Sequence, residues 1–445
     1  MSRRFGSSHS RRTSPVDILT PFLFVAVAIL AAIALGVVYM TVAVNFVARG
    51  QDRVDSVPPL GADPSAFMRA LHGAAGDGVT QGNDVALYQN GSEIFPPMLD
   101  AIRHSRSSVH FSSYIFWSGT IGDRFASAFC DAARRGVVVR IVIDSEGSSG
   151  QLDPAVVRRL RDAGCRVAWY RRAQWYDFAK YNHRTHRRLL VVDGVIGFTG
   201  GAGVADPWLG NAEGPAYWRD THARVTGPAV AALQAGFTDS WNQCTEELLL
   251  HERDYPSLRA TGTMAVAGVM SMPSSGASAA QRVVAACIAA ASRTLRITNA
   301  YFVPTPAFVA ALCSARKRGA AVTVIVPGPH HNKPLVRRAS RHTWHELIAH
   351  GVEIHEYQPT MVHAKTLIVD GVVSLVGSIN FDPRSFSLNA ECGIVVASAE
   401  LAGEMERVFA ADLARCVRVD PASLDALPLH TRAVDALLYW VRAQL

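Results

Sequence analysis

The first pattern along the chain is a long apolar run without any charged residue. It extends over 31 residues, from Ile18 to Ala48, and is bounded by Asp17 and Arg49. About 20 apolar residues are enough to cross the hydrocarbon core of a bilayer. A cleaved signal peptide would have a shorter apolar region, of about 7–15 residues. The pattern therefore predicts a basic stub and one retained transmembrane anchor within residues 1–50.

The charges on either side of this run predict its orientation. Four arginines precede the run, and the two arginines that closely follow it stand beside aspartates. The residues are Arg3, Arg4, Arg11 and Arg12 before the run, and Arg49 and Arg53, beside Asp52 and Asp55, after it. Because basic flanks are retained on the cytoplasmic side, we expect residues 1–17 in the cytoplasm and the body of the protein on the other side.

Beyond a connector at residues 51–84, one succession of patterns occurs twice. In the first half, an apolar run at 108–117 precedes a helical stretch that ends at Gly136 and an almost wholly apolar strand at 137–144. The second half repeats this with a run at 295–303, a helical stretch ending at Gly319 and a strand at 322–326. Alternating helices and apolar strands are typical of βαβ units with a buried sheet. We therefore predict an α/β protein with two duplicated lobes.

Composition marks the limits of the lobes. Residues 262–280 are rich in Gly, Ser and Ala, which predicts a linker at 251–280 between a first lobe at 85–250 and a second lobe at 281–420. We expect an amphipathic helix at 421–445, which either lies at a membrane interface or closes the core of the second lobe. Its apolar residues are Val434, Leu437, Leu438, Trp440, Val441 and Leu445.

Overall composition excludes several classes of protein. With 49% hydrophobic and 18% charged residues among 445, the chain is too apolar to be intrinsically disordered. Its 7 cysteines lack the close spacing of a zinc site or a disulfide framework. The formal net charge of +7 suits an anionic partner, either nucleic acid or anionic lipid.

The polar positions with the clearest chemical meaning recur at one spacing, with a histidine at i, a cation at i+2 and an aspartate at i+7. The two sets are His186, Arg188 and Asp193, and His363, Lys365 and Asp370. Positions i and i+2 of a strand share a face, so each histidine is expected beside its cation. Each aspartate precedes a glycine, and we expect it to fix a type I′ turn through local backbone N–H groups.

Two histidines with fixed cations suit phosphodiester chemistry. One imidazole attacks phosphorus, and the other protonates the leaving alcohol and then deprotonates the incoming one. Lysine and arginine neutralise the phosphoryl oxygens, as a metal ion would. Since no cluster of carboxylates indicates a metal site, we predict neither a metal nor a cofactor.

The duplicated pattern resembles the HxKxxxxD signature of the phospholipase D superfamily, and longer matches resemble its bacterial cardiolipin synthase branch. The resemblance covers residues 85–420. It implies two phospholipase D-type lobes, each a mixed sheet flanked by helices, packed around a shared active site. The longer matches are 182–188, 196–201, 217–222, 351–357 and 376–386, continuing to Asn389 and Glu391.

The resemblance also implies roles for single residues. The two histidines, the two cations and the two aspartates of the motifs would be the catalytic set. Asp220 and Glu391 would each orient the histidine of the opposite half. Gly201, Ser378 and Asn380 would bind the phosphate of the substrate.

The first half departs from the family pattern at two positions. Arg188 replaces the usual lysine, and Gly203 replaces an asparagine. The arginine keeps the positive charge, whereas the glycine removes a side-chain donor. We therefore expect an active but slow enzyme, in which Gly203→Asn raises the rate or leaves it unchanged.

The function implied by the resemblance is that of a cardiolipin synthase. Such an enzyme transfers a phosphatidyl group between two phosphatidylglycerol molecules through a phosphohistidine and releases glycerol. The alternatives are a phospholipase D that uses water or another alcohol, a nuclease-type phosphodiesterase, and a lipid-binding homologue without activity.

The predicted anchor and the cations around both motifs favour an anionic phospholipid, phosphatidylglycerol, over nucleic acid. We expect a single-pass protein of the bacterial inner membrane with its body on the periplasmic side. The cations are Arg171, Arg172, Lys180, Arg184 and Arg187 around the first motif, and Lys333, Arg337, Arg338 and Arg341 before the second.

Overall fold

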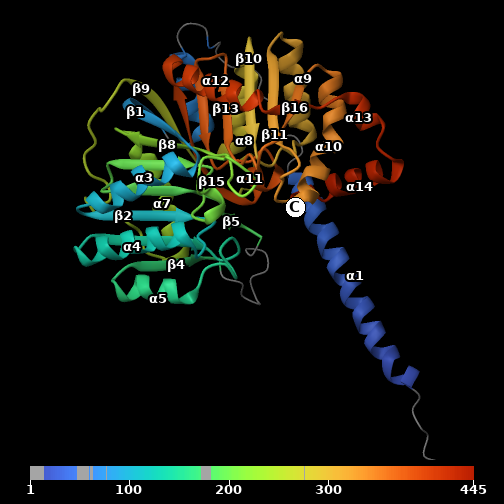
Figure 1. Ribbon diagram of the computed structural model, residues 1–445, viewed down its shortest axis with the longest axis horizontal. Helices are drawn as coiled ribbons and strands as arrows, with labels where there is room; N and C mark the ends of the chain where they lie inside the picture. Colours follow the sequence, from blue (N-terminus) through green and yellow to red (C-terminus); the bar gives the residue numbers. More distant parts are fainter. Residues whose placement is uncertain (1–14, 48–59, 61–63, 77, 172–181, 275) are drawn as a thin grey trace, which may run out of the picture.

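The protein consists of an α/β body from which one long helix extends (Figure 1). The computed structural model describes residues 15–47, 60, 64–76, 78–171, 182–274 and 276–445, with the side chains of 23–39 and 42 in the first helix. The flanking arginines on which the predicted orientation rests lie outside these residues, as do Arg172 and Lys180 of the predicted cationic rim.

The helices and strands follow one another in two similar series. The first described elements are α1 (Pro15–Val47) and α2 (Ser65–Ala75). The first half contains β1 (Val79–Gln89), α3 (Asn90–His104), β2 (Ser108–Ser113), α4 (Thr120–Arg134), β3 (Val138–Asp144), α5 (Pro154–Asp162), β4 (Arg166–Tyr170), β5 (Arg184–Thr185), β6 (Leu189–Val192), β7 (Ile196–Gly200), the 3-10 helix η1 (Asp206–Trp208), β8 (Thr221–Thr226) and α7 (Val230–Thr245). The second half contains β9 (Met264–Ser271), α8 (Ala279–Ala290), β10 (Thr294–Asn299), α9 (Pro306–Lys317), β11 (Ala321–Pro327), α10 (Pro334–Ala349), β12 (Glu353–Tyr357), β13 (Lys365–Val369), β14 (Val373–Gly377), α11 (Pro383–Ser387), β15 (Asn389–Ala397) and α12 (Ala399–Leu413). It is followed by β16 (Cys416–Arg418), α13 (Pro421–Asp425), α14 (Leu429–Trp440) and the 3-10 helix η2 (Arg442–Gln444).

Sixteen strands of the described residues form one mixed sheet. From one edge to the centre the order is β4-β3-β2-β6-β7-β8-β1, and from the other edge it is β16-β12-β11-β10-β13-β14-β15-β9, with β5 paired to β15. In both halves three strands are parallel, β2–β4 and β10–β12, and the following hairpin is antiparallel. The prediction of a duplicated α/β fold is confirmed, because both halves repeat the same strand order.

The two halves meet where β1 and β9 pair at the centre of the sheet. β9 lies inside the segment 251–280 that was predicted to be a linker, and β1 begins inside the predicted connector, so both segments contribute a central strand to the sheet. The small residues of β9 serve close packing: a Cβ atom on Gly268 would lie 2.5 Å from the Cβ of Ala232 in α7. Small residues therefore indicated a crowded strand here rather than a loose linker.

Helices cover both faces of the sheet, which explains why its parallel strands are apolar on both sides. In β3, Ile141 belongs to the core cluster that contains Phe129 of α4, whereas the next residue, Val142, packs with Phe237 of α7. In β11, Val324 likewise belongs to the cluster of α9, and Ile325 to the cluster of α12. Successive side chains thus enter separate cores.

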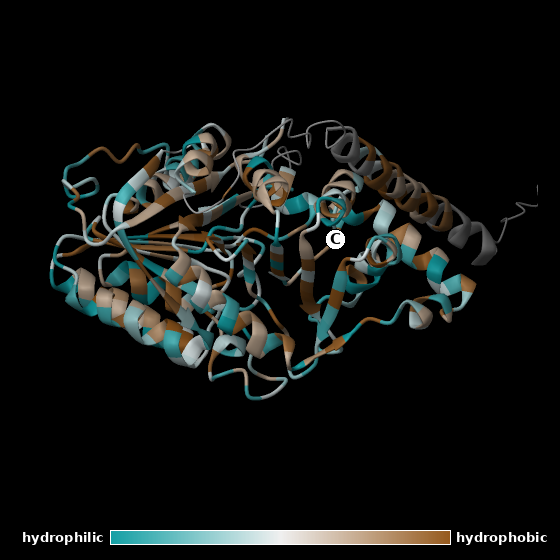
Figure 2. Cartoon of the chain, turned by 90° about the horizontal axis from the view of Figure 1, so that it is seen from above, coloured by the Kyte–Doolittle hydropathy of each residue, from teal (hydrophilic) through white to brown (hydrophobic). Residues whose placement is uncertain are grey.

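The long helix α1 extends away from the body, and its described residues are mainly hydrophobic (Figures 1 and 2). Its apolar side chains are exposed, among them Leu23 at 66% and Phe24 at 71%. Among the residues that the structure describes, no helix combines the length and apolarity needed to cross a membrane. The helix lies against η2 near the C-terminus.

The predicted C-terminal helix is divided into α13, α14 and η2. α14 packs against α10, and Tyr439 is buried with Val303, Val336 and Ala339. On the remaining surface Leu437 is 59% exposed and Trp440 is 42% exposed. The segment therefore closes part of the second lobe and also presents apolar side chains to solvent.

Candidate active site

Each histidine of the repeated motif stands just before a hairpin in the middle of its half of the sheet. His186 precedes β6, and His363 precedes β13. The turns have positive φ at Asp193 (53°) and Gly194, and at Asp370 (52°) and Gly371. Positive φ at both central residues is what a type I′ turn requires, so this part of the turn prediction is confirmed.

The two aspartates do not reach the cavity between the histidines, because each lies at the far end of its strand. The carboxylate of Asp193 accepts hydrogen bonds from the backbone N–H groups of residues 106–108. Asp370 does the same for residues 292–294. The prediction of local contacts was wrong, because these amides belong to the segments that lead into β2 and β10. The aspartates hold the hairpins to the sheet, and their inclusion among catalytic groups has no support in this geometry.

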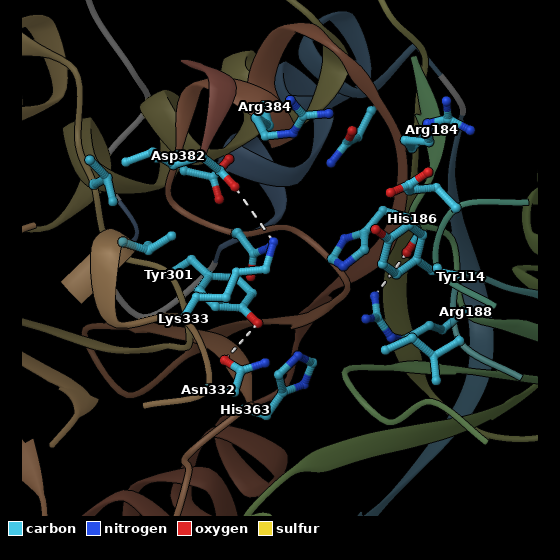
Figure 3. Close-up of a pocket in the computed structure, with 18 of the residues that line it drawn as sticks. Tyr114, Arg184, His186, Arg188, Tyr301, Asn332, Lys333, His363, Asp382 and Arg384 are labelled. Atoms are coloured by element: carbon cyan, nitrogen blue, oxygen red, sulfur yellow. Dashed lines mark hydrogen bonds between the residues drawn. The ribbon is translucent and has the colours of Figure 1, made fainter. Parts of the chain in front are cut away.

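The histidines from the two halves face one cavity of about 310 Å³. Figure 3 shows His186 and His363 with Arg188, Tyr114, Tyr301 and Lys333 around this space. Both halves contribute to its walls, and the chain also lines it near its C-terminus with Arg442 and Leu445. The cavity is thus a property of the assembled halves and not of either motif alone.

Each histidine is bonded to a carboxylate from the other half. Nδ1 of His186 lies 2.9 Å from both carboxylate oxygens of Glu391. Nδ1 of His363 lies 2.9 Å from Oδ2 of Asp220. Such a partner selects the tautomer whose other nitrogen, Nε2, faces the substrate.

In the pair of His363 and Asp220, the carboxylate is ionised. Burial alone would raise the pKa of Asp220, but the hydrogen bond and charge of His363 and the charge of Lys365 lower it well below its usual value. Trp208 also donates its indole N–H to Oδ2, at 2.8 Å. For His363 itself, burial and the nearby Lys365 lower the pKa, against the opposing effect of Asp220.

In the pair of His186 and Glu391, the pKa of the carboxyl group is raised rather than lowered. Burial raises the pKa of Glu391 to about 7, although Ser378 and Ser385 donate hydrogen bonds to it. Burial, followed by the positive charges of Arg188 and Lys365, lowers the pKa of His186. This pair therefore changes its protonation near neutral pH, whereas Asp220 stays ionised.

The two motif cations occupy different positions. Arg188 lines the cavity and donates a hydrogen bond to the main-chain oxygen of His186 at 2.9 Å. Its Nε is buried and has no partner among the described residues. Nζ of Lys365 lies behind the cavity wall, 2.8 Å from Nδ1 and 3.0 Å from Nε2 of His363. Arg188 can therefore touch a bound phosphoryl group directly, while Lys365 mainly adds charge at His363.

Of the three predicted phosphate-binding residues, only Asn380 lines the cavity. Ser378 donates to Glu391 instead. The amide of Gly201 donates to the carbonyl of Thr221, and a Cβ atom there would lie 2.1 Å from Oδ1 of Asp220. Gly201 thus makes room for a carboxylate, so the prediction that it binds phosphate is not supported by this arrangement.

Two tyrosines at the cavity were missed by the sequence reasoning. Tyr114 packs edge-on against His186, with ring centroids 5.3 Å apart, and Tyr301 packs edge-on against His363 at 6.0 Å. Each follows the first parallel strand of its half, β2 or β10. A residue-by-residue comparison of the runs 108–117 and 295–303 would have found them as a repeated pair.

Trp208 and Trp218 also enclose His363. The indole ring of Trp218 stacks on the imidazole at 5.4 Å, and Trp208 meets it edge-on at 5.0 Å. No spacing pattern in the sequence indicated these contacts, because Trp208 in η1 and Trp218 lie in the connection between β7 and β8. This connection meets the second half where the N–H of Arg219 donates to the carbonyl of Met361.

Gly203 lies where a larger side chain would press on this aromatic wall. A Cβ atom there would be 3.0 Å from Cβ of Ile115 and 3.3 Å from ring carbons of Trp208. The sequence expectation that Gly203→Asn helps is therefore reversed. We expect about a tenfold loss of activity and a destabilisation of about 1–3 kcal/mol from overpacking. Initial rates and thermal unfolding of the variant test this, and a faster enzyme with unchanged unfolding would contradict it.

Most of the predicted cationic rim is engaged in ion pairs. Arg187 contacts Asp239 at 2.7 Å, Arg337 contacts Glu356 at 2.6 Å, and Arg338 and Arg341 share Asp435. Of the rim residues that the structure describes, only Arg184 and Lys333 line the cavity. Arg384 and Arg442, which the sequence reasoning did not select, line it as well.

No group of three or more potential metal-binding His, Cys, Asp or Glu side chains occurs within the described ranges.

The site defines the class of two-lobed phospholipase D-type proteins. Two duplicated halves build one cavity, and each half supplies one histidine together with the carboxylate that contacts the histidine of the other half.

The family described as "Cardiolipin synthase, PLD-like domain" matches residues 98–213 and 284–413 of the chain. The chain belongs to this family. It is 34% identical over 359 residues to a cardiolipin synthase of Oceanobacillus iheyensis, covering 80% of this chain and 74% of the relative. It is also 34% identical to cardiolipin synthase A of Pseudomonas fluorescens, covering 75% and 69%.

Solved structures show the same fold. Phosphatidylserine synthase of Haemophilus influenzae superposes with a TM-score of 0.63 at 13% identity, over 81% of this chain and 95% of the other. Polyphosphate kinase of Porphyromonas gingivalis gives a TM-score of 0.51 at 11% identity, over 88% and 57%. At these identities the similarity concerns the fold alone.

Proposed function

We propose that the protein is a cardiolipin synthase that joins two phosphatidylglycerol molecules and releases glycerol. The proposal rests mainly on two histidine–carboxylate pairs that cross between the halves and face one cavity. The names of its relatives support the same activity.

The chemistry proceeds in two displacements at phosphorus. One imidazole attacks the phosphodiester of the donor lipid, forms a phosphatidyl–histidine bond and breaks the bond to glycerol, which takes a proton from the other imidazole. The second lipid then attacks with its terminal hydroxyl. The other imidazole takes the hydroxyl proton, and the bond to histidine breaks as cardiolipin forms.

The surrounding side chains have distinct tasks in this proposal. Arg188 stabilises the charge on the phosphoryl oxygens directly. Lys365 contributes charge through its contact with His363. Asp220 and Glu391 orient the two imidazoles and stabilise their cationic forms.

A lipid substrate fits the position of the cavity. Arg442 and Leu445 at its wall belong to the segment against which α1 lies. The apolar run at 18–48 and the exposed apolar side chains of α1 support a membrane anchor at this side of the body. We propose that the anchor holds the cavity at the surface of the inner membrane, with the body on the periplasmic side.

Vesicles of pure phosphatidylglycerol test this function. The purified full-length protein should form cardiolipin and free glycerol in equal amounts, and it should do so in excess EDTA, since the proposed steps use only side chains. Release of phosphatidic acid without cardiolipin would instead identify a phospholipase D. A loss of activity in EDTA that Mg²⁺ or Zn²⁺ restores would contradict the metal-free chemistry.

A further inference from the structure

Three cations on the cavity wall have no role in the reaction at phosphorus described above. Lys333, Arg384 and Arg442 line the same cavity as the histidines. Within the described ranges, none of them forms an ion pair with a carboxylate side chain within 4.0 Å. Most rim cations, in contrast, are paired in this way.

Two of these cations converge on one short segment. Arg384 donates a hydrogen bond to the main-chain oxygen of Ala443 at 3.3 Å, and Lys333 donates one to that of Leu445 at 3.5 Å. Arg384 also donates to Oδ1 and to the main-chain oxygen of Asn182, at 3.1 and 3.2 Å. All of these acceptors of Arg384 are neutral amide oxygens, whereas a phosphate oxygen would add an opposite charge, and pairs of arginine with phosphate are frequently bidentate.

The cavity also contains carboxylates that balance part of this charge. Glu146 and Asp382 line it, and Asp382 accepts a hydrogen bond from the backbone N–H of Ser385 at 2.8 Å. Burial raises the pKa of Asp382 to about 6. Counting Arg184 and Arg188, five cations and two carboxylates face the cavity, so the wall keeps a positive excess.

The proposed reaction needs two phosphates in the cavity at the same time. The donor phosphate reacts at the histidines. The acceptor lipid has its own phosphodiester, which does not react and lies one glycerol unit from the attacking hydroxyl. A water molecule or a simple alcohol has no such group.

We infer that Lys333 and Arg384 form a second anion subsite, which binds the unreacted phosphodiester of the acceptor lipid and thereby selects phosphatidylglycerol over water and neutral alcohols. This inference rests on the proposed function. Figure 3 shows both side chains at the cavity on the side of Tyr301 and Asp382, where Nζ of Lys333 lies 5.8 Å from the centroid of the Tyr301 ring.

The test compares two soluble acceptors that differ by a phosphodiester. Glycerophosphoglycerol is the deacylated headgroup of the acceptor lipid, and glycerol is its neutral counterpart. Both acceptors carry an isotopic label, because transfer to glycerol regenerates phosphatidylglycerol. With phosphatidylglycerol vesicles as donor, incorporation of the label into lipid is measured over a range of acceptor concentrations. The quantity of interest is the ratio of the two values of kcat/KM for the acceptor.

Lys333→Met removes the charge and nearly preserves the length of an exposed side chain. We expect it to lower the preference for glycerophosphoglycerol by about tenfold to hundredfold, as befits a hydrogen bond to a charged group, and Lys333→Arg to restore most of it. Arg337→Gln is the matched control, because this cation is four residues further on, is paired with Glu356 and does not line the cavity. It should keep the wild-type ratio.

The outcomes separate this inference from the proposed function. An unchanged ratio in Lys333→Met overturns the subsite, even if the wild type makes cardiolipin. A ratio that falls in Lys333→Met while the wild type makes no cardiolipin would support the subsite and refute the proposed lipid acceptor. A ratio that also falls in Arg337→Gln would overturn the subsite in favour of a general effect of surface charge.

Discussion

Replacing either motif histidine by alanine is expected to reduce phosphatidyl transfer by about 10⁴-fold or more, since loss of a nucleophile or its proton carrier has effects of this order. Among the described residues that line the cavity, His186 and His363 are the only histidines. One of the two forms the bond to phosphorus, and the other moves the proton in both displacements. His186→Ala and His363→Ala should therefore be equally inactive in the vesicle assay, although only one of them loses the nucleophile.

The design of this experiment must allow for the buried carboxylates. Removing a histidine leaves Glu391 or Asp220 without its partner, and breaking a buried pair in this way costs about 3–5 kcal/mol. His186→Gln and His363→Gln retain a donor towards the carboxylate and should keep the wild-type unfolding temperature more closely. His104→Ala, an exposed position on α3, is the control for a harmless loss of imidazole. Near-native activity in any variant of His186 or His363 would refute the two-histidine mechanism.

The second large effect is an asymmetry between the two carboxylates. At pH 7, Asp220→Asn is expected to reduce the rate by about 10³–10⁴-fold, as in other sites where the carboxylate behind a catalytic histidine becomes an amide. The reason is that the low pKa of Asp220 keeps it fully ionised beside His363. Glu391→Gln should cost far less at this pH, about tenfold, because the neutral carboxyl group that glutamine imitates is a populated form of Glu391 in the folded protein, whereas Asp220 has no populated neutral form for asparagine to imitate.

The pH dependence checks this assignment. Wild-type activity should rise as the pH increases through about 7, because ionised Glu391 makes its imidazole partner a stronger base. Glu391→Gln should lose that rise, and Asp220→Asn should keep it. If both variants lose the same activity and retain the same profile, the two carboxylates are equivalent and the argument from burial fails.

The raised pKa of Glu391 also makes the stability of the folded protein depend on pH. Glu391 binds a proton more tightly in the folded state than in the unfolded state, where its pKa is near 4.3. The folded state therefore loses stability as the pH rises from about 4 towards 7. Asp220 has the opposite shift, so its contribution is lost only in strong acid. Glu391→Gln should accordingly unfold at a higher temperature than the wild type at pH 8.

Several features of the fold and the site could be predicted because they depend on local geometry. A histidine at i and a cation at i+2 share one face of a strand whatever the rest of the protein does. The Asp-Gly pairs fix positive φ angles and hence the hairpins. The same succession of strands and helices in both halves then indicated a duplication, and the order of strands in the sheet agrees with it.

Predictions from short sequence patterns were wrong where packing between distant segments determines the role of a residue. The small residues of β9 indicated flexibility when taken alone, yet they are needed because the strand is confined between its neighbours and α7. Gly201 was assigned to phosphate by its motif, but its lack of a side chain serves the carboxylate of Asp220. Three arginines of α10 predicted as a lipid-binding rim are paired instead with two acidic residues that follow them in the chain.

The sequence by itself determined the repeated motif and the two-lobed α/β class, and it indicated the two histidines with their cations as candidate site residues. Only the tertiary structure decided how these groups act together. His186 and Glu391 are 205 residues apart, and His363 and Asp220 are 143 apart. The two pairs form because the halves join at β1 and β9 and thereby bring each carboxylate to the histidine of the other half. Backbone geometry specifies which residues share a strand face. Contacts between residues so far apart in the chain depend instead on how the two halves of the sheet pack, and the spacing of residues within one motif cannot predict that packing.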